Sequence, residues 1–291
     1  MIGLACALAV VALFSGFTIV SRLGLTSAIP ILDLGALRFG IGGLILTPLL
    51  IRYGFGGVPL PKALLLALLG GLGFALLAYS GFALAPAAHG AVLLHGTLPL
   101  STFVLLIFID PAQVRRATAP GLALITVGVV LMAWDTLRTA SAQQLLGDAF
   151  LLLASFCWSA YGITVRRLRL PSLQAASIVA VFSMLGFLPP YIAVQGATLL
   201  DHGWQVLLLQ GVFQGVVIGV ASIFFYTRAV TILGASETAL YTAAVPGVTT
   251  LGAIALLAEW PSSTEWAGVT LATIGMMFAI RTLYTKPETK P

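Results

Sequence analysis

Long apolar runs are the feature that most limits what this chain can fold into. Runs of about 17 to 25 residues recur along the sequence, and each is long enough for one helical crossing of a bilayer. They lack the alternation of barrel strands. We therefore predict an all-α integral membrane protein with ten transmembrane helices, over residues 2–21, 34–51, 63–84, 88–109, 119–134, 147–165, 174–194, 205–229, 237–258 and 265–283.

The composition supports the same class of protein. The chain is 59% hydrophobic and 8% charged, whereas soluble domains carry about 25% charged residues, so these residues cannot cover a water-facing surface. The net charge of +5 comes without a basic groove interleaved with aromatic residues, which argues against nucleic acid as a partner. Cys6 and Cys157 lie in apolar runs, as small core residues do. We expect no metal and no cofactor.

The distribution of Lys and Arg predicts the orientation, because these residues accumulate on the cytoplasmic side of membrane proteins. Arg22 and Arg138 lie on one side of the predicted helices, and Arg38 lies within the second helix. The other basic residues share the opposite side: Arg52, Lys62, Arg115, Arg116, Arg166, Arg167, Arg169, Arg228, Arg281, Lys286 and Lys290. We predict that both termini are cytoplasmic, with a polar tail over residues 285–291.

The chain matches itself when it is shifted by 147 residues. This shift pairs Pro99 with Pro246, and also Gly121 with Gly268 and Gly128 with Gly275, without a gap. Proline and glycine are informative here because they mark kinks and close helix contacts. Each half, 1–140 and 141–284, contains an odd number of predicted helices, so the second must enter the membrane from the opposite side. The sequence thus predicts inverted repeats, which place a substrate site between the halves.

Several short motifs resemble the EamA-type family of the drug/metabolite transporter superfamily. They are the segment 12–22 (ALFSGFTIVSR), the segment 33–39 (DLGALRF), the run 226–229 (YTRA), and Glu237, Pro246, Glu259 and Gly268. The resemblance covers essentially the whole length and is greatest to YddG-type aromatic amino acid exporters. It implies a multi-pass protein of the bacterial inner membrane, with ten helices around a central cavity.

Two proline-bearing helix faces are candidates for the substrate path. His95, Pro99 and Thr102 share one face of the fourth predicted helix, and the repeat places Thr242 and Pro246 on the ninth. Proline can open a helix where its carbonyls meet a cavity. An equally good interpretation is that Pro99 and Pro246 only kink their helices and that His95 bonds a neighbouring carbonyl.

Amide and aromatic side chains complete the candidate binding set. Gln210 and Gln214 could bind a zwitterion without burying a charge, beside a glycine face (211, 215 and 219) typical of a close helix contact. Aromatic rings could stack on a ring-bearing substrate, although ordinary packing is the alternative. The remaining candidates are Ser15, Phe17, Tyr79, Trp158, Tyr161, Tyr226 and Tyr241.

Three groups are candidates for titration or charge recognition. Glu237 stands at a helix start, where it could bind a proton or an ammonium group, or simply cap the helix. His95 is the other candidate for proton coupling. Arg38 could hold a carboxylate if it reached inward, but its place near a helix start favours snorkelling to the interface. His89 and His95 project to different faces, which argues against a metal site, and His202 has no predicted role.

These features favour a secondary transporter that exports small amphipathic metabolites, aromatic amino acids in particular, by alternating access. A monomer is sufficient for this mechanism. Another metabolite or a drug-like amine is the alternative substrate. A membrane-embedded enzyme would need a nucleophile or metal with a base, but the chain has no H-E-x-x-H, G-x-S-x-G or Walker A sequence. A channel is disfavoured because no ring of like charges or carbonyl filter is visible.

Overall fold

The computed structural model describes residues 1–27, 29–111, 118–139, 142–196, 198–233, 238 and 241–284, and the regular elements within these ranges are helices. In chain order they are α1 (Ile2–Thr26), α2 (Ile31–Tyr53), α3 (Leu60–Ala67), the π-helix η1 (Leu68–Leu72), α4 (Gly73–Leu84), α5 (Ala87–His89), the π-helix η2 (Gly90–Gly96), α6 (Leu98–Ile109), α7 (Ala119–Thr139), α8 (Ala142–Leu168), α9 (Ser172–Gln195), the 3-10 helix η5 (Thr198–Asp201), α10 (Trp204–Gln210), the π-helix η6 (Gly211–Ala221), α11 (Ser222–Leu233), α13 (Val245–Leu257) and α14 (Ser263–Tyr284).

Seven helices in the described ranges are long and apolar enough to cross a membrane. They are Ile2–Thr26, Ile31–Tyr53, Leu60–Leu84, Ala87–Ile109, Ala142–Leu168, Leu173–Gln195 and Trp204–Tyr226. Ala119–Trp134 and Val245–Leu257 form shorter apolar helices. The prediction of an all-helical, multi-pass membrane protein is therefore confirmed, while the total of ten spans stays a prediction.

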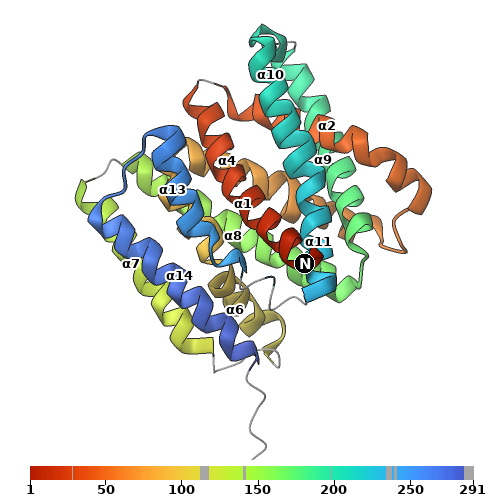
Figure 1. Cartoon of the computed structure of the whole chain (residues 1–291). Helices are drawn as coiled ribbons and strands as arrows, with labels where there is room; N and C mark the ends of the chain where they lie inside the picture. The colour runs from red at the N-terminus through yellow and green to blue at the C-terminus, as the bar shows by residue number, and fades with distance from the viewer. Residues whose placement is uncertain are drawn as a thin grey trace, which may run out of the picture.

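Helix α1 runs through the middle of the bundle (Figure 1). It packs against α4, α11 and α13, and its small residues Ala7, Ser21 and Gly24 are buried. Small side chains at such positions let neighbouring helices approach closely, which is the main source of packing energy inside a bilayer. The central position of α1 brings its aromatic residues next to helices from both parts of the chain.

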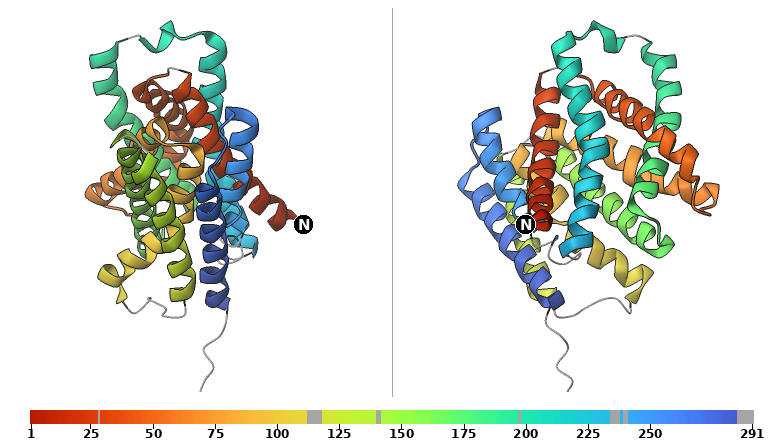
Figure 2. Two further views of the ribbon diagram at one scale, coloured as in Figure 1. Left: turned by 90° about the vertical axis from the view of Figure 1, so that its left-hand side faces the viewer. Right: turned by 45° about the vertical axis from the view of Figure 1, so that its right-hand side comes forward.

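Glycines let α7 and α14 touch through their backbones. The two helices lie side by side at one flank of the molecule (Figures 1 and 2). A side chain at Gly121 would meet Gly275 O at 2.5 Å, and one at Gly128 would meet Gly268 O at 2.8 Å. Because higher numbers on one helix face lower numbers on the other, α7 and α14 are antiparallel.

A second glycine contact joins α2 to η6, beside the middle of the bundle. A side chain at Gly215 would lie 2.5 Å from the Cβ of Ile41, and one at Gly42 would lie 3.4 Å from Gly215 O. Positions 211, 215 and 219 thus serve as a helix contact, as the small-residue pattern indicates. This contact holds residues 38–42 of α2 against the second part of the chain.

Two adjacent glycines in η1 admit side chains from α8 and α9. A side chain at Gly70 would meet the ring of Tyr161 at 2.6 Å, and one at Gly71 would meet the hydroxyl of Ser183. The wide π-helical turn here is of a kind often found at functional sites. Tyr161 and Ser183 therefore approach the η1 backbone directly, next to the cavity described below.

Replacing Gly121 by alanine should destabilise the protein by about 1–3 kcal/mol, the usual range for overpacking a tight contact. The new methyl group would collide with backbone atoms of α14, which cannot move aside as a flexible side chain can. Thermal unfolding in detergent measures the change. Gly162→Ala is the matched control, because a side chain there would meet nothing within 4 Å. Equal stability of the two variants would contradict the backbone contact.

Candidate functional site

A cavity lined mainly by aromatic rings lies among α1, α2, η1, α4, α8 and α9. Its aromatic lining consists of Phe14, Phe17, Phe39, Phe74, Trp158 and Tyr161, and His95 from η2 joins them. Polar hydroxyls reach it from Ser183 and Ser222, and Arg38 contributes a positive charge. No lining residue in the described part of the chain is acidic. The cavity therefore suits a ring-bearing molecule and favours negative over positive charge.

The rings in this cavity form two groups of contacts. The centroid of Trp158 lies 4.7 Å from that of Phe74 and 5.3 Å from that of Tyr161. On the other side, His95 stacks on Phe14 at 5.6 Å. Such aromatic pairs contribute about 0.5–1.5 kcal/mol each beyond area burial, and a substrate ring can join them in the same geometry.

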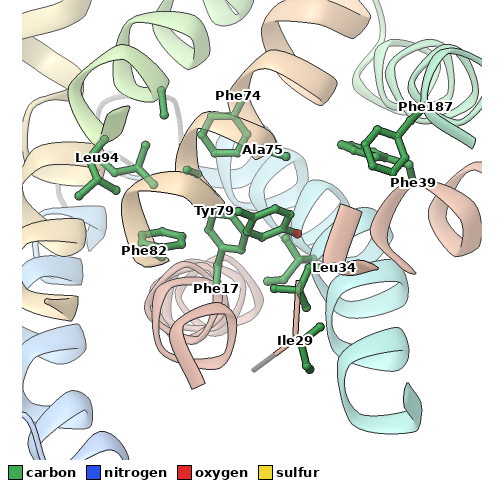
Figure 3. Packing of buried hydrophobic residues seen from close by; sticks show 14 of the residues in the cluster. Phe17, Ile29, Leu34, Phe39, Phe74, Ala75, Tyr79, Phe82, Leu94 and Phe187 are labelled. Atoms are coloured by element: carbon green, nitrogen blue, oxygen red, sulfur yellow. The ribbon is translucent and has the colours of Figure 1, made fainter. Parts of the chain in front are cut away.

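Arg38 points into the cavity, so the prediction that it snorkels to the membrane interface is wrong. The central carbon of its guanidinium group lies 5.0 Å from the Phe17 ring centroid and 5.8 Å from that of Phe74. Figure 3 shows these two rings at the core of the bundle, close to Tyr79. Helix α2 begins at Ile31, which puts Arg38 about 10 Å along the helix, farther from the interface than the sequence suggested.

Tyr79, Gln210 and Gln214 lie together but outside the cavity lining. The Tyr79 hydroxyl donates to Gln214 Oε1 at 3.1 Å, and Gln214 Nε2 donates to Ser21 Oγ at 2.9 Å. Gln210 Nε2 donates to the carbonyl of Val20 at 3.0 Å. The two amides thus bind α1 to η6 and α10 through buried hydrogen bonds, rather than standing free to receive a substrate.

The other predicted side chains are spread around the cavity. Thr102 donates to Ser159 Oγ at 3.1 Å, and Ser15 is buried. The Tyr226 ring is half exposed and stacks on the Phe14 ring, with 6.2 Å between the ring centroids. Tyr241 packs beside Cys6 and Ala229, with Thr242 next to it in the chain. The structure therefore brings Phe17, His95, Trp158 and Tyr161 together at the cavity. Among the described residues, the other predicted side chains do not line it.

The two prolines stand at helix starts, and Glu237 lies outside the described residues. Pro99 occupies the first turn of α6, directly after the π-helical η2 ends, and Pro246 occupies the first turn of α13. The N–H groups of a first turn have no acceptor within the helix, so a proline there costs no hydrogen bond. Neither proline lines the cavity, although Leu98 does.

Charged side chains close one end of the bundle in a cluster that we call the polar seal: Arg22, His89, Asp148, Glu259 and Glu265. Arg22 forms an ion pair with Glu259 and donates to the carbonyl of Phe82 at 2.6 Å. The other oxygen of Glu259 accepts from the backbone N–H of Ala87 at 2.7 Å. Charge-assisted bonds of this kind are about twice as strong as neutral ones. They tie α1 and the α4–α5 turn to the segment after α13.

His89 links two carboxylates at the centre of the polar seal. Its Nδ1 lies 2.8 Å from Asp148 Oδ1 and its Nε2 lies 3.0 Å from Glu265 Oε1. Carboxylates accept hydrogen bonds, so this arrangement suits a ring that donates from both nitrogens and carries a positive charge. The ring is 1% exposed. His89 thereby joins α5 to α8 and α14.

The same end of the bundle holds another buried acid, outside the polar seal. Asp33, at the start of α2, accepts from the Tyr191 hydroxyl at 2.7 Å, and its other oxygen lies 2.7 Å from His202 Nε2. These contacts join α2 to α9 and to the connection that follows α9. His202 therefore has a structural partner that its position in a predicted loop did not reveal.

The opposite end, where α6 and α8 finish, is held by weaker contacts in the described ranges. Arg167 lies 3.6 Å from Asp110, and the Arg167 side chain is half exposed. Gln174 donates to the carbonyls of Tyr53 and Gly54 from the surface of the bundle. Exposed ion pairs contribute little stability, about 0–1 kcal/mol, whereas the polar seal is largely buried. The two ends of the bundle are therefore closed unequally.

The sequence did not reveal the polar seal, because each of its acids looked like an ordinary helix-end residue. The signal that existed was indirect. Arg22, Glu259 and Glu265 all fall on the side that the sequence predicts to be poor in basic residues, where they have few other partners. Their pairing depends on segments far apart in the chain, which no local pattern reports.

Comparison with known family models finds a similarity in the second part of the chain. Residues 145–281 match the EamA-like transporter family. This match supports the resemblance to the drug/metabolite transporter superfamily, a superfamily of transporters and not of enzymes. It begins in α8 and ends in α14, so this EamA-like region holds Trp158 and Tyr161 of the cavity as well as Glu259 and Glu265 of the polar seal.

Solved structures share the fold over nearly the whole chain. Altogether 15 chains of solved structures match. A crystal structure of a protein that is 20% identical in sequence aligns with a TM-score of 0.63, covering 95% of this chain and 96% of its own. At this identity the likeness concerns the fold alone. No curated protein sequence matches the chain.

His89→Gln should lower the free energy of unfolding by about 3 kcal/mol or more, because it removes one partner from a buried ionic cluster. The two carboxylates that face His89 would then lose the positive charge between them. Thermal unfolding in detergent measures the loss. His202→Gln is the control, since His202 is partly exposed and Asp33 would keep the Tyr191 hydroxyl. A loss no larger than that of the control would argue against the cluster.

Proposed function

We propose that the protein is a secondary transporter that exports small amphipathic metabolites, aromatic amino acids among them, across the bacterial inner membrane. The observation that carries this proposal is the aromatic cavity beside Arg38, enclosed by helices of both halves of the chain. Ligand sites are mostly apolar clefts with a few placed polar groups, which describes this cavity. The match of residues 145–281 to EamA-like transporters supports a transport function, and the direction of export follows from the family resemblance.

Transport would proceed by alternating access between two inverted repeats, residues 1–140 and 141–284, with ten membrane helices in total. The α7–α14 contact supports this symmetry. The shift of 147 residues maps Gly121 onto Gly268 and Gly128 onto Gly275. Gly121 touches Gly275 while Gly128 touches Gly268, so exchanging the two halves exchanges these contacts.

The polar seal would act as the gate on the outer side. It ties α1 and α5, from the first half, to α8, α14 and the segment after α13, from the second. The cavity instead extends toward the opposite end, because Ala176 lines it only about 6 Å from the start of α9. That end carries the excess of basic residues, so it is the cytoplasmic side, with both termini. On this proposal the conformation described here would be inward-facing.

Two other functions fit less well. A channel would need a path open at both ends, whereas the polar seal closes one end with buried ion pairs. An enzyme would need a nucleophile beside a base in the cavity, whereas His95 of the described lining has Thr18, which does not line the cavity, as its hydrogen-bond contact at 3.4 Å. Proton coupling remains to be assigned between His95 and Glu237.

Counterflow in proteoliposomes tests the transport proposal. Labelled phenylalanine or tryptophan should exchange across the membrane, and Trp158→Ala should slow exchange roughly tenfold, because stacking pairs contribute about 0.5–1.5 kcal/mol each. Trp134→Ala is the matched control, since Trp134 is exposed on α7 and does not line the cavity. Absence of exchange with every aromatic amino acid would exclude this substrate class. Equal exchange rates for both variants would indicate that the substrate does not contact Trp158.

Thiol labelling tests the gate. In a background with Cys6 and Cys157 replaced by alanine, a cysteine at Ala180 in the cavity should react with an impermeant reagent from the cytoplasmic side only. A cysteine at Ala253, beside the polar seal, should react from the outer side only after Arg22→Glu breaks the ion pair with Glu259. Adding Glu259→Arg should restore protection. Labelling of both positions from both sides would indicate a channel instead.

A further inference from the structure

Arg38 is the one basic side chain among the residues that line the cavity in the described part of the chain. It lies beside two phenylalanine rings, Phe17 and Phe74, with the central carbon of its guanidinium group 5.0 and 5.8 Å from their centroids. Cation–π contacts of this kind hold the guanidinium group in place but leave its N–H groups available at the edge. A positive charge is thus fixed deep within an apolar cavity.

The charge of Arg38 lacks a counterion in the described ranges. Its Nη1 atom is buried without a hydrogen-bond partner there. The Tyr79 hydroxyl also faces the guanidinium group, but it is neutral and donates its proton to Gln214. Leaving a buried charged donor without an acceptor is unfavourable, so this site favours a ligand that supplies a negative oxygen.

A carboxylate fits this requirement better than other anions of similar size. Its two oxygens match the planar fork of a guanidinium group, and a single arginine suits a single charge. Phosphate groups carry more charge and usually meet several cationic or backbone donors, whereas the other lining residues here are rings, aliphatic side chains, glycines and hydroxyls. The ring of the ligand would then extend toward Trp158 and Tyr161.

The cavity offers no comparable partner for an ammonium group. Among the lining residues of the described chain, the polar side-chain groups other than Arg38 and His95 are the indole N–H of Trp158, which can only donate, and the hydroxyls of Tyr161, Ser183 and Ser222. The fixed charge of Arg38 also repels a second cation in a medium of low dielectric constant. The amino group of an amino acid would therefore add little to binding at this site.

We propose that Arg38 binds the carboxylate of the ligand, and that the cavity selects aromatic carboxylates whether or not they carry an amino group. The proposal rests on the transport function proposed above and narrows its substrate class. Deaminated aromatic acids should then be ligands, and aromatic amines should be poor ones.

Binding in detergent tests the proposal with three probes that share one ring: phenylalanine, 3-phenylpropionate and 2-phenylethylamine. At neutral pH the carboxylates should bind about tenfold to a hundredfold more tightly than the amine, the range expected for one charged hydrogen-bonded pair. Arg38→Gln should weaken both carboxylates by a similar factor and leave the amine unchanged or tighter. Arg38→Lys, which keeps the charge but loses the planar fork, should recover part of the affinity.

Arg52→Gln is the matched control, because Arg52 lies exposed near the end of the same helix. Tighter binding of the amine, equal binding of all three probes, no binding of any probe, or equal losses for all probes in Arg38→Gln would each overturn the proposal. Counterflow separates it from the transport function. Selective binding of carboxylates without exchange would contradict the transport function but not the carboxylate site. Exchange of the amine without exchange of the acids would contradict the carboxylate site but not the transport function.

Discussion

Close backbone contact at glycine is the constraint on which this structure depends. Inside a bilayer, lipid chains are as apolar as the helices, so burial gives little reason for one helix to prefer another. Packing must come from surfaces that fit, and a glycine removes the side chain that would hold two backbones apart. The α7–α14 pair and the α2–η6 pair both use it. The second of these holds the part of α2 that bears Arg38 beside Gly219, at the wall of the cavity.

Charge is then distributed in two different ways. At the polar seal, Arg22 and His89 are paired with three carboxylates, so burial of these charges is tolerated. In the cavity, Arg38 lies against the faces of aromatic rings and has no carboxylate partner in the described part of the chain. The paired cluster is suited to holding helices together, since separating its members is costly. The unbalanced charge is suited to recognising a ligand, because a partner from outside completes it.

Part of the site could be predicted from residue type alone. Phe17, His95, Trp158 and Tyr161 were selected as polar or aromatic groups in apolar segments, and all four line the cavity. Tyr79, Gln210 and Gln214 were selected by the same rule, yet they face α1 and one another. The rule could not separate these groups, because buried polar side chains bind substrate or bind neighbouring helices with the same chemistry. Arg38 was misjudged because its distance from the helix start was underestimated.

By itself, the sequence determined the class of the protein: an all-helical membrane chain whose apolar runs match the bilayer. These properties depend on length, composition and order along the chain. Only the tertiary structure decided which side chains meet, such as Arg22 with Glu259 and His89 with Glu265. These helices are apolar on nearly every face, so their patterns carry almost no signal of how each is rotated about its axis. That rotation, set by packing against neighbours, turned Arg38 toward the cavity.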